Sequence, residues 1–270
     1  MARIPEEEVE RIKRGVSLAE LVRGSGVELR GQGDNLLGRC LWHEDKASSL
    51  VVTVSRNLWH CMAGCGGGSV IDWVMKSRDV SFRHAVEILR SGAPLVAAPK
   101  RGGPLPSPVS ASAEDREVLA QVVAYYHETL EQSPEALGYL ERRGLRSEEA
   151  IRHFRLGFAN RTLGYHLPPK TVRAGQEMRE RLQRLGLVRE SGHEHFNGSL
   201  VIPIFGEAGE VLGMYGRKIT PNLRPGTPQH LYLPGPHRGL FNLSALRESK
   251  TEILCEALAD CGLSHSHSEA

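Results

Sequence analysis

The sequence predicts an α+β fold in which a linker joins a small domain to a larger one. Cysteine and histidine pairs flank a strand-like insert in the first quarter of the chain. After residue 114, helical stripes of apolar residues are followed by two strand-like runs. Between these parts, residues 91–113 hold five prolines and three glycines without apolar periodicity, which is typical of a linker.

The small domain, expected over residues 1–90, is predicted to contain several short helices. Ser17 and Ser81 are suited to cap two of them, because a serine hydroxyl can accept a hydrogen bond from the first helical turn. A Gly-Gln-Gly-Asp turn within residues 27–40 predicts two strands ahead of the cysteine-rich segment. The expected helices are residues 5–14, 18–22, 69–78 and 82–90.

The larger domain, expected over residues 114–250, opens with a helical stripe. Its strands are expected at 200–205 and 211–215, around a Gly-Glu-Ala-Gly turn. Residues 155–160 predict a loop, and residues 230–246 predict an irregular loop that leads into a short helix. The expected helices of this domain are residues 114–130, 134–143, 148–154 and 171–188.

Two pairs of metal-ligating residues flank the strand-like insert. Cys40 and His43 form a C-x2-H knuckle, and Cys61 and Cys65 form a C-x3-C knuckle after seventeen intervening residues. The insert predicts a β-hairpin, which brings its two ends together and lets both knuckles meet one ion. Thiolate and imidazole donors in two close pairs are typical of the closed tetrahedral shell of structural Zn²⁺. The sequence therefore predicts one zinc ion bound by these four residues.

Spacing and context distinguish the zinc site from other interpretations of the same residues. C-x3-C is less common than C-x2-C, so His60 stays open as a substitute ligand. Ordinary buried thiols beside a surface histidine would not explain the paired spacing. A disulfide is disfavoured, because the cysteine count of five is odd and the sequence shows no signal peptide. These points make the reducing cytoplasm the expected compartment.

Charge and hydropathy limit the classes of partner. No apolar run approaches the length of a membrane span, so we expect no membrane association. The formal net charge is only +2. Any nucleic-acid surface must therefore come from local clusters of lysine and arginine.

The order of these motifs resembles bacterial-type DNA primase over most of the chain. IPEEEVERIKRGVSLAELV, the C-x2-H knuckle, the hairpin and WHCMAGCGGGSVIDWVM are similar to that family's Cys-His-Cys-Cys zinc-binding domain. YYHETLEQSPEALGYLERRGL, FRLGFAN and LVIPIFGEAGEVLGMYGRKI resemble the amino-terminal part of its polymerase core. LYLPGPHRGLFN is similar to the segment that leads into its Toprim fold. The resemblance implies a zinc ribbon, a linker, a mixed α/β primase-core subdomain and, over residues 251–270, an incomplete Toprim segment.

The resemblance implies a DNA-directed RNA polymerase that makes short primers from NTPs on a single-stranded DNA template. Toprim carboxylates hold Mg²⁺ or Mn²⁺, which neutralises the charge of the attacking oxygen and the triphosphate. Glu256, in CEALAD, matches the family's leading glutamate, and Asp260 its second acidic position. On periodicity alone, both residues are better explained as exposed helix carboxylates. The resemblance favours the metal-binding role for Glu256 instead.

Template contacts are expected at both ends of the resemblance. Arg217, in YGRKI, matches the family's arginine on a basic ridge, and Lys218 is expected to assist it by neutralising phosphates. Ordinary solvated charge is the alternative for both. Near the knuckles, Arg39, Trp42 and Trp59 are expected to offer a stacking surface for bases. Packing of the two tryptophans over the knuckles is an equally good interpretation.

Two departures from the family pattern bear on activity. The KYLNSP-like segment reads LYLPGP, without the lysine and asparagine that would contact substrate or template. The chain ends at Ala270, ahead of the family's aspartate-rich metal motif and of the domain that contacts the replicative helicase. We therefore expect a template-binding chain that is inactive alone. The alternatives are a non-catalytic zinc module that binds single-stranded DNA, for a mobile element or as a replication accessory protein, and a protein-docking platform.

Overall fold

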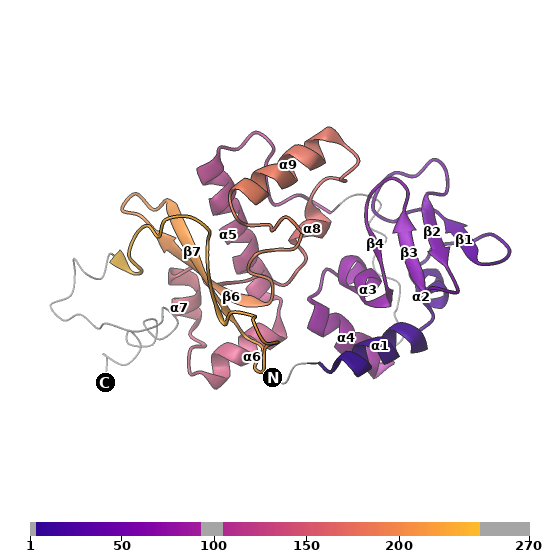
Figure 1. The fold of residues 1–270 in the computed structure, drawn as a ribbon, viewed down its shortest axis with the longest axis horizontal. Helices are drawn as coiled ribbons and strands as arrows, with labels where there is room; N and C mark the ends of the chain where they lie inside the picture. Colours follow the sequence, from indigo (N-terminus) through magenta and orange to yellow (C-terminus); the bar gives the residue numbers. More distant parts are fainter. Residues whose placement is uncertain (1–3, 93–104, 244–270) are drawn as a thin grey trace. The chain divides into compact units, whose positions relative to one another are not determined.

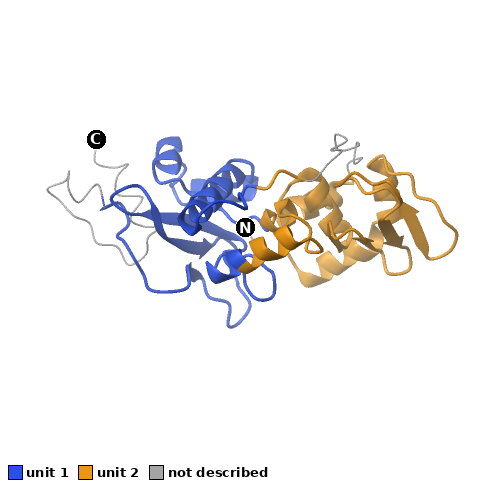
Figure 2. Ribbon diagram, turned by 90° about the horizontal axis from the view of Figure 1, so that it is seen from above, with its two compact units in different colours: residues 1–3, 108–161, 181–270 blue, residues 4–107, 162–180 orange. Residues whose placement is uncertain are grey.

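The computed structural model describes residues 4–92 and 105–243, which fall into two compact units (Figure 2). Unit 2 comprises Ile4–Ser107 and Thr162–Glu180. The described residues of unit 1 are 108–161 and 181–243. Residues 162–180, which the sequence analysis places in the larger domain, thus belong with the amino-terminal part of the chain.

Two helices of unit 2, α2 and α4, begin after the capping serines that the sequence predicts. Ser17 and Ser81 each accept a hydrogen bond from the backbone amide three residues later, at 3.3 and 3.2 Å. Ser69 forms a capping box with Asp72, so the first amides of α3 do not lack partners. The helices are α1 Glu6–Gly15, α2 Leu18–Gly24, α3 Val70–Arg78, α4 Phe82–Ser91 and α8 Leu163–His166, while α9 Arg173–Arg184 begins in unit 2 and ends in unit 1.

The sheet of unit 2 is antiparallel, with strand order β1-β2-β3-β4 (Figure 1). The predicted hairpin is confirmed: Leu50, which starts β2, pairs with Cys61, which ends β3. Of the two strands expected ahead of the first knuckle, β1 forms, and the other is reduced to one bridge between Arg30 and Leu37. The strands are β1 Asn35–Gly38, β2 Leu50–Thr53, β3 Leu58–Cys61 and β4 Gly67–Gly68.

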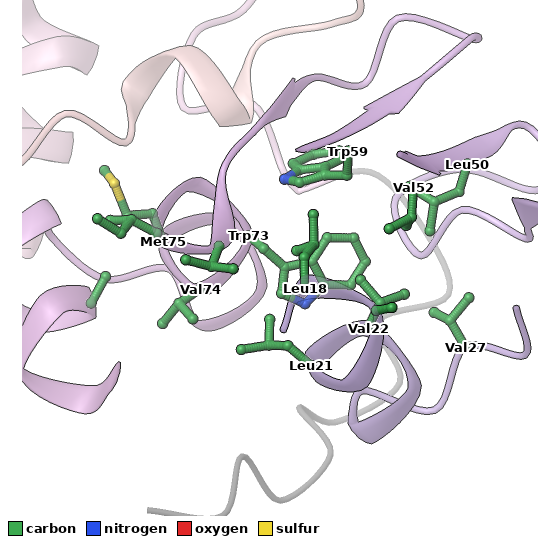
Figure 3. Close-up of a cluster of buried hydrophobic side chains, with 14 of the residues drawn as sticks. Leu18, Leu21, Val22, Val27, Leu50, Val52, Trp59, Trp73, Val74 and Met75 are labelled. Atoms are coloured by element: carbon green, nitrogen blue, oxygen red, sulfur yellow. The ribbon is translucent and has the colours of Figure 1, made fainter. Parts of the chain in front are cut away.

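The core of unit 2 is built around the three tryptophans of the chain. Trp42, Trp59 and Trp73 are only 3%, 2% and 0% exposed. Their ring centroids lie 4.9 to 5.2 Å apart, in tilted and edge-to-face arrangements that favour aromatic packing. Aliphatic side chains from α2, α3 and the sheet surround Trp59 and Trp73 (Figure 3); they include Leu18, Leu21, Val22, Leu50, Val52 and Val74.

Unit 1 packs helices against a second antiparallel sheet, of order β5-β6-β7-β8 (Figure 1). One core cluster joins Leu200 and Tyr215 of the sheet to Leu140 of α6 and Ile151 of α7. The predicted β6–β7 hairpin and the three helices before it are confirmed. The elements are α5 Asp115–Glu131, α6 Pro134–Arg142, α7 Glu148–His153, β5 Gly157–Phe158, β6 Ser199–Phe205, β7 Val211–Lys218 and β8 His230–Tyr232.

Two short strands lie where the sequence predicts loops. β5 falls within residues 155–160 and pairs with β6, and β8 falls within residues 230–246 and pairs with β7. A Cβ on Gly157 would lie 2.7 Å from the Cβ of Tyr126, so this glycine lets β5 approach α5 closely. The loop predictions are therefore wrong at these positions, because pairing partners distant in sequence decide the structure.

The described part of the predicted linker is irregular but packed. Leu105, Val109 and Ala113 are all buried, and residues 93–104 lie outside the described residues. Among the helices that the structure describes, none combines the length and the apolarity that a membrane crossing requires.

Candidate metal centre and nucleic-acid interface

The four predicted metal ligands lie together in unit 2. The sulfurs of Cys40, Cys61 and Cys65 and a ring nitrogen of His43 all lie within 4.8 Å of one another. Nδ1 of His43 is 3.2 Å from Sγ of Cys65 and 3.9 Å from Sγ of Cys61. Tetrahedral zinc, with Zn–S bonds of about 2.3 Å, separates its sulfurs by roughly 3.8 Å. The donor set and its spacing therefore fit one structural Zn²⁺ ion.

The hairpin and two glycines bring the knuckles together. Cys61 lies opposite Leu50, so it occupies the end of the hairpin that adjoins the loop of residues 39–49, which carries the first knuckle. Gly64 and Gly66 have φ values of +84° and +140°, which side-chain-bearing residues rarely adopt. The amide of Cys61 donates to the carbonyl of Gly66 at 2.9 Å, and that of Gly64 to the carbonyl of Cys61 at 3.0 Å. This turn accommodates the extra residue of C-x3-C.

His60 does not join the metal group. Alternation along β3 leaves His60 exposed and Cys61 buried. Cys40, His43, Cys61 and Cys65 are the one group of three or more potential ligands among the described residues. Cys65 thus takes the fourth position, and the open alternative of a His60 ligand is not needed.

The thiols of Cys40 and Cys65 shift each other's pKa values in opposite directions. A hydrogen bond between Cys40 and Cys65 lowers the pKa of Cys65 to about 5 and raises the pKa of Cys40 above its usual range. The lowered pKa of Cys65 favours its thiolate, which is the form of cysteine that ligates a metal.

Asp45 orients the imidazole of His43. One carboxylate oxygen accepts hydrogen bonds from the amide of Cys40 and the hydroxyl of Ser49, both at 2.8 Å. The other oxygen lies 3.5 Å from Nε2 of His43. Burial alone would raise the pKa of Asp45, but the hydrogen bonds outweigh it and hold that pKa below its ordinary value. The hydroxyl of Ser49 lies within hydrogen-bond distance of Nε2 of His43, at 3.3 Å, and donates to Asp45, so Ser49 and Asp45 together hold the ring with Nδ1 facing the sulfurs.

Asp45→Asn is expected to weaken zinc binding by about tenfold or more, because the amide supports the histidine less well than the carboxylate does. Competition with a chromophoric chelator at neutral pH measures the change. Glu44→Gln, at the exposed neighbouring position, serves as the control and should bind zinc as the wild type does. Equal zinc affinity of the Asp45 variant and the wild type would show that His43 needs no such support.

The tryptophans do not form the expected stacking surface. Trp42 and Trp59 are buried against Trp73, so neither ring presents a face to a base. That expectation is wrong, and the alternative of packing beside the knuckles is what the structure shows. Arg39 is exposed next to Cys40, and its contact with DNA stays a prediction.

Arg217 and Lys218 are the last two residues of β7, and their side chains lie on opposite faces of the sheet. Successive strand residues point to opposite faces of a sheet, so Arg217 shares a face with Tyr215. Lys218 donates a hydrogen bond to the backbone carbonyl of Asn197. Burial, and then two nearby arginines, lower the pKa of Lys218 to about 8. The two residues therefore do not act as one basic pair.

An exposed face along β8 escaped the sequence analysis. In register, Tyr232 lies opposite Tyr215, and His230 lies opposite Arg217. Tyr232 is 41% exposed and stacks on His237, with ring centroids 4.4 Å apart and planes 25° from parallel. Arg217, His230, Tyr232 and His237 are called the β8 face below. The His-x-Tyr spacing of residues 230 and 232 was its signal, because a strand puts both on one side.

The candidate catalytic carboxylates, Glu256 and Asp260, lie outside the described residues. Their expected role in holding Mg²⁺ or Mn²⁺ stays a prediction.

Comparison with known proteins gives consistent matches along the chain. The CHC2 zinc finger family matches residues 4–100, and the family of the DNA primase catalytic core, N-terminal domain, matches residues 125–245. A DNA primase of Halalkalibacterium halodurans is 29% identical over 291 residues, which cover 96% of this chain and 44% of that protein. A DNA primase of Helicobacter pylori is 28% identical over 244 residues, covering 88% and 40%.

A solved structure of the Aquifex aeolicus primase, with its zinc-binding and RNA polymerase domains, is 22% identical. It has a TM-score of 0.37 and covers 84% of this chain and 54% of that chain. The chain spans less than half the length of the curated relatives it matches. The two family matches follow one another along the chain, and the metal group and β8 face lie within them. Residues 4–100 therefore belong to the CHC2 zinc ribbon family, and residues 125–245 belong to the family of the amino-terminal domain of the DNA primase catalytic core.

Proposed function

We propose that this chain binds single-stranded DNA as the template for RNA primer synthesis. The curated relatives are DNA primases, and the chain spans less than half their length. Template binding is what we propose for this chain, and primer synthesis from NTPs with Mg²⁺ or Mn²⁺ is the reaction that this binding would serve. In it, the zinc ribbon of unit 2 and the β8 face of unit 1 both contact the template.

The stacked, exposed Tyr232, on the same face of the sheet as Arg217, is the observation that supports template binding most directly. Single-strand binding sites combine aromatic side chains on which bases stack with cations that neutralise the backbone. Tyr232 and His237 provide the first component, and Arg217 provides the second. Tyr139 and Tyr215 raise the pKa of Arg217 although burial opposes them, so its charge is retained beside the aromatic rings.

A titration of the full chain with a fluorescent single-stranded oligonucleotide, at two salt concentrations, tests the proposal. Tyr232→Ala is expected to reduce affinity by about 1–3 kcal/mol, the typical loss for one stacked base. Arg217→Ala should weaken binding and lower the salt slope by about 1, because one phosphate contact is lost.

Arg116→Ala is the charge-matched control, since Arg116 is exposed in the first turn of α5. It should bind DNA like the wild type. Affinity without salt dependence would favour the protein-docking platform instead. Equal affinities of all three variants would remove the β8 face from the proposal.

A further inference from the structure

Lys76 is a buried cation beside the metal group. Lys76, on α3, is only 4% exposed. Because lysine is almost never buried without a partner, this burial needs an explanation. The ammonium donates a hydrogen bond to the backbone carbonyl of Cys65, itself one of the four ligands. It also lies 5.0 Å from the ring centroid of Trp42. Lys76 is therefore held against the second knuckle.

No carboxylate in the described part of the chain explains this burial. Asp72 lies one turn earlier on α3, but its carboxylate accepts hydrogen bonds from the amide and the hydroxyl of Ser69, both at 2.7 Å. Burial lowers the pKa of Lys76, and the thiols of Cys65, Cys40 and Cys61 are the nearby groups that favour its charged form. The partner of Lys76 is thus the metal group itself.

We infer that Lys76 is the counter-charge of the zinc centre. Zn²⁺ bound to three thiolates and one neutral imidazole carries one net negative charge. A buried charge is costly unless an opposite charge compensates it, and the ammonium supplies that compensation. Lys76 is thus a positioning residue that stabilises the zinc-bound state.

A role of Lys76 through its charge and a role through packing predict opposite orders of zinc affinity for two variants of the full chain. Lys76→Met replaces the lysine by an unbranched side chain of similar length that carries no charge. Lys76→Arg keeps the positive charge but has a larger head group. Chelator competition should show zinc affinity reduced on the order of 10- to 100-fold in K76M and largely retained in K76R. If Lys76 acts through packing alone, K76M should be harmless and K76R damaging.

Lys46→Met is the matched control, because Lys46 is an exposed lysine in the loop of the first knuckle. It makes the same chemical change and should leave zinc affinity unaltered. Substitution of Co²⁺ adds a spectroscopic readout, since the thiolate-to-cobalt absorption band responds to nearby charge. The band should shift in K76M and stay in place in K46M.

A double-mutant cycle isolates the charge term. Cys65→His replaces one thiolate by a neutral ligand, which removes the net negative charge of the centre. K76M should therefore reduce zinc affinity much less in that background than in the wild type.

Three results would overturn the inference: an equal cost of K76M in both backgrounds, an unchanged zinc affinity of K76M, or a K76R variant that binds zinc as weakly as K76M. If K76M no longer binds zinc at all, the inference is supported when K76R still binds the metal, and it is overturned when K76R fails as well.

Discussion

Cys40→Ser, or removal of the metal by a chelator, is expected to unfold the zinc ribbon while residues 108–161 and 181–243 stay folded. The strands of the ribbon are only two to four residues long. Binding of structural zinc supplies on the order of 10–16 kcal/mol in comparable small domains, and this binding energy is folding energy. Whole domains are stable by only about 5–15 kcal/mol, so we expect the loss of the metal to exceed what the remaining contacts supply.

The tryptophans make this prediction easy to measure. All three tryptophans of the chain lie in the core of unit 2, so tryptophan emission reports on the ribbon alone. Chelation should shift that emission to the red, while hydrogen exchange of α5, β6 and β7 should keep its protection. His60→Ala is the control, because His60 is exposed on β3 outside the metal group. Emission that does not change when the metal is removed would refute the zinc-dependent fold.

Local sequence signals predicted those elements that have their own period or cap. The β2–β3 hairpin follows from two apolar runs around a turn, and the helices after Ser17 and Ser81 follow from their caps. β5 and β8 have two and three residues, too few for alternation to show. Both form because the long strands β6 and β7 offer them a partner. Such pairing depends on contacts that no short window of sequence contains.

The residues of the candidate site likewise fall into those that the sequence pattern identifies and those that only the folded structure reveals. The zinc ligands could be identified because a tetrahedral ion demands paired donors, and pairing leaves a trace in spacing. Asp45 and Lys76 left no such trace, because each acts through a ligand and depends on the folded backbone. The tryptophan surface was wrong for a related reason. Trp42, Trp59 and Trp73 are spread over thirty-two positions of the sequence, and they meet only in the folded core.

Trp59→Ala is expected to cost the ribbon about 3–5 kcal/mol of stability, because it removes a fully buried aromatic side chain from the tryptophan core. Trp59→Phe should cost much less. The indole Nε1 of Trp59 has no hydrogen-bond partner among the described residues, so phenylalanine forfeits packing volume but no polar contact. Denaturant unfolding of the zinc-bound chain, followed by the emission of the remaining tryptophans, measures both changes.

Tyr232→Ala provides the opposite case. Tyr232 is an exposed aromatic residue, so its removal should change stability by no more than about 0.5 kcal/mol and weaken binding of single-stranded DNA. Trp59→Phe should leave DNA affinity intact, since a buried ring offers no face to a base. If Trp59→Phe instead weakened DNA binding without loss of stability, the ribbon would have to expose Trp59 when it meets the template. The core of unit 2 would then open on binding, and the cost of that opening would appear as a lower affinity for DNA.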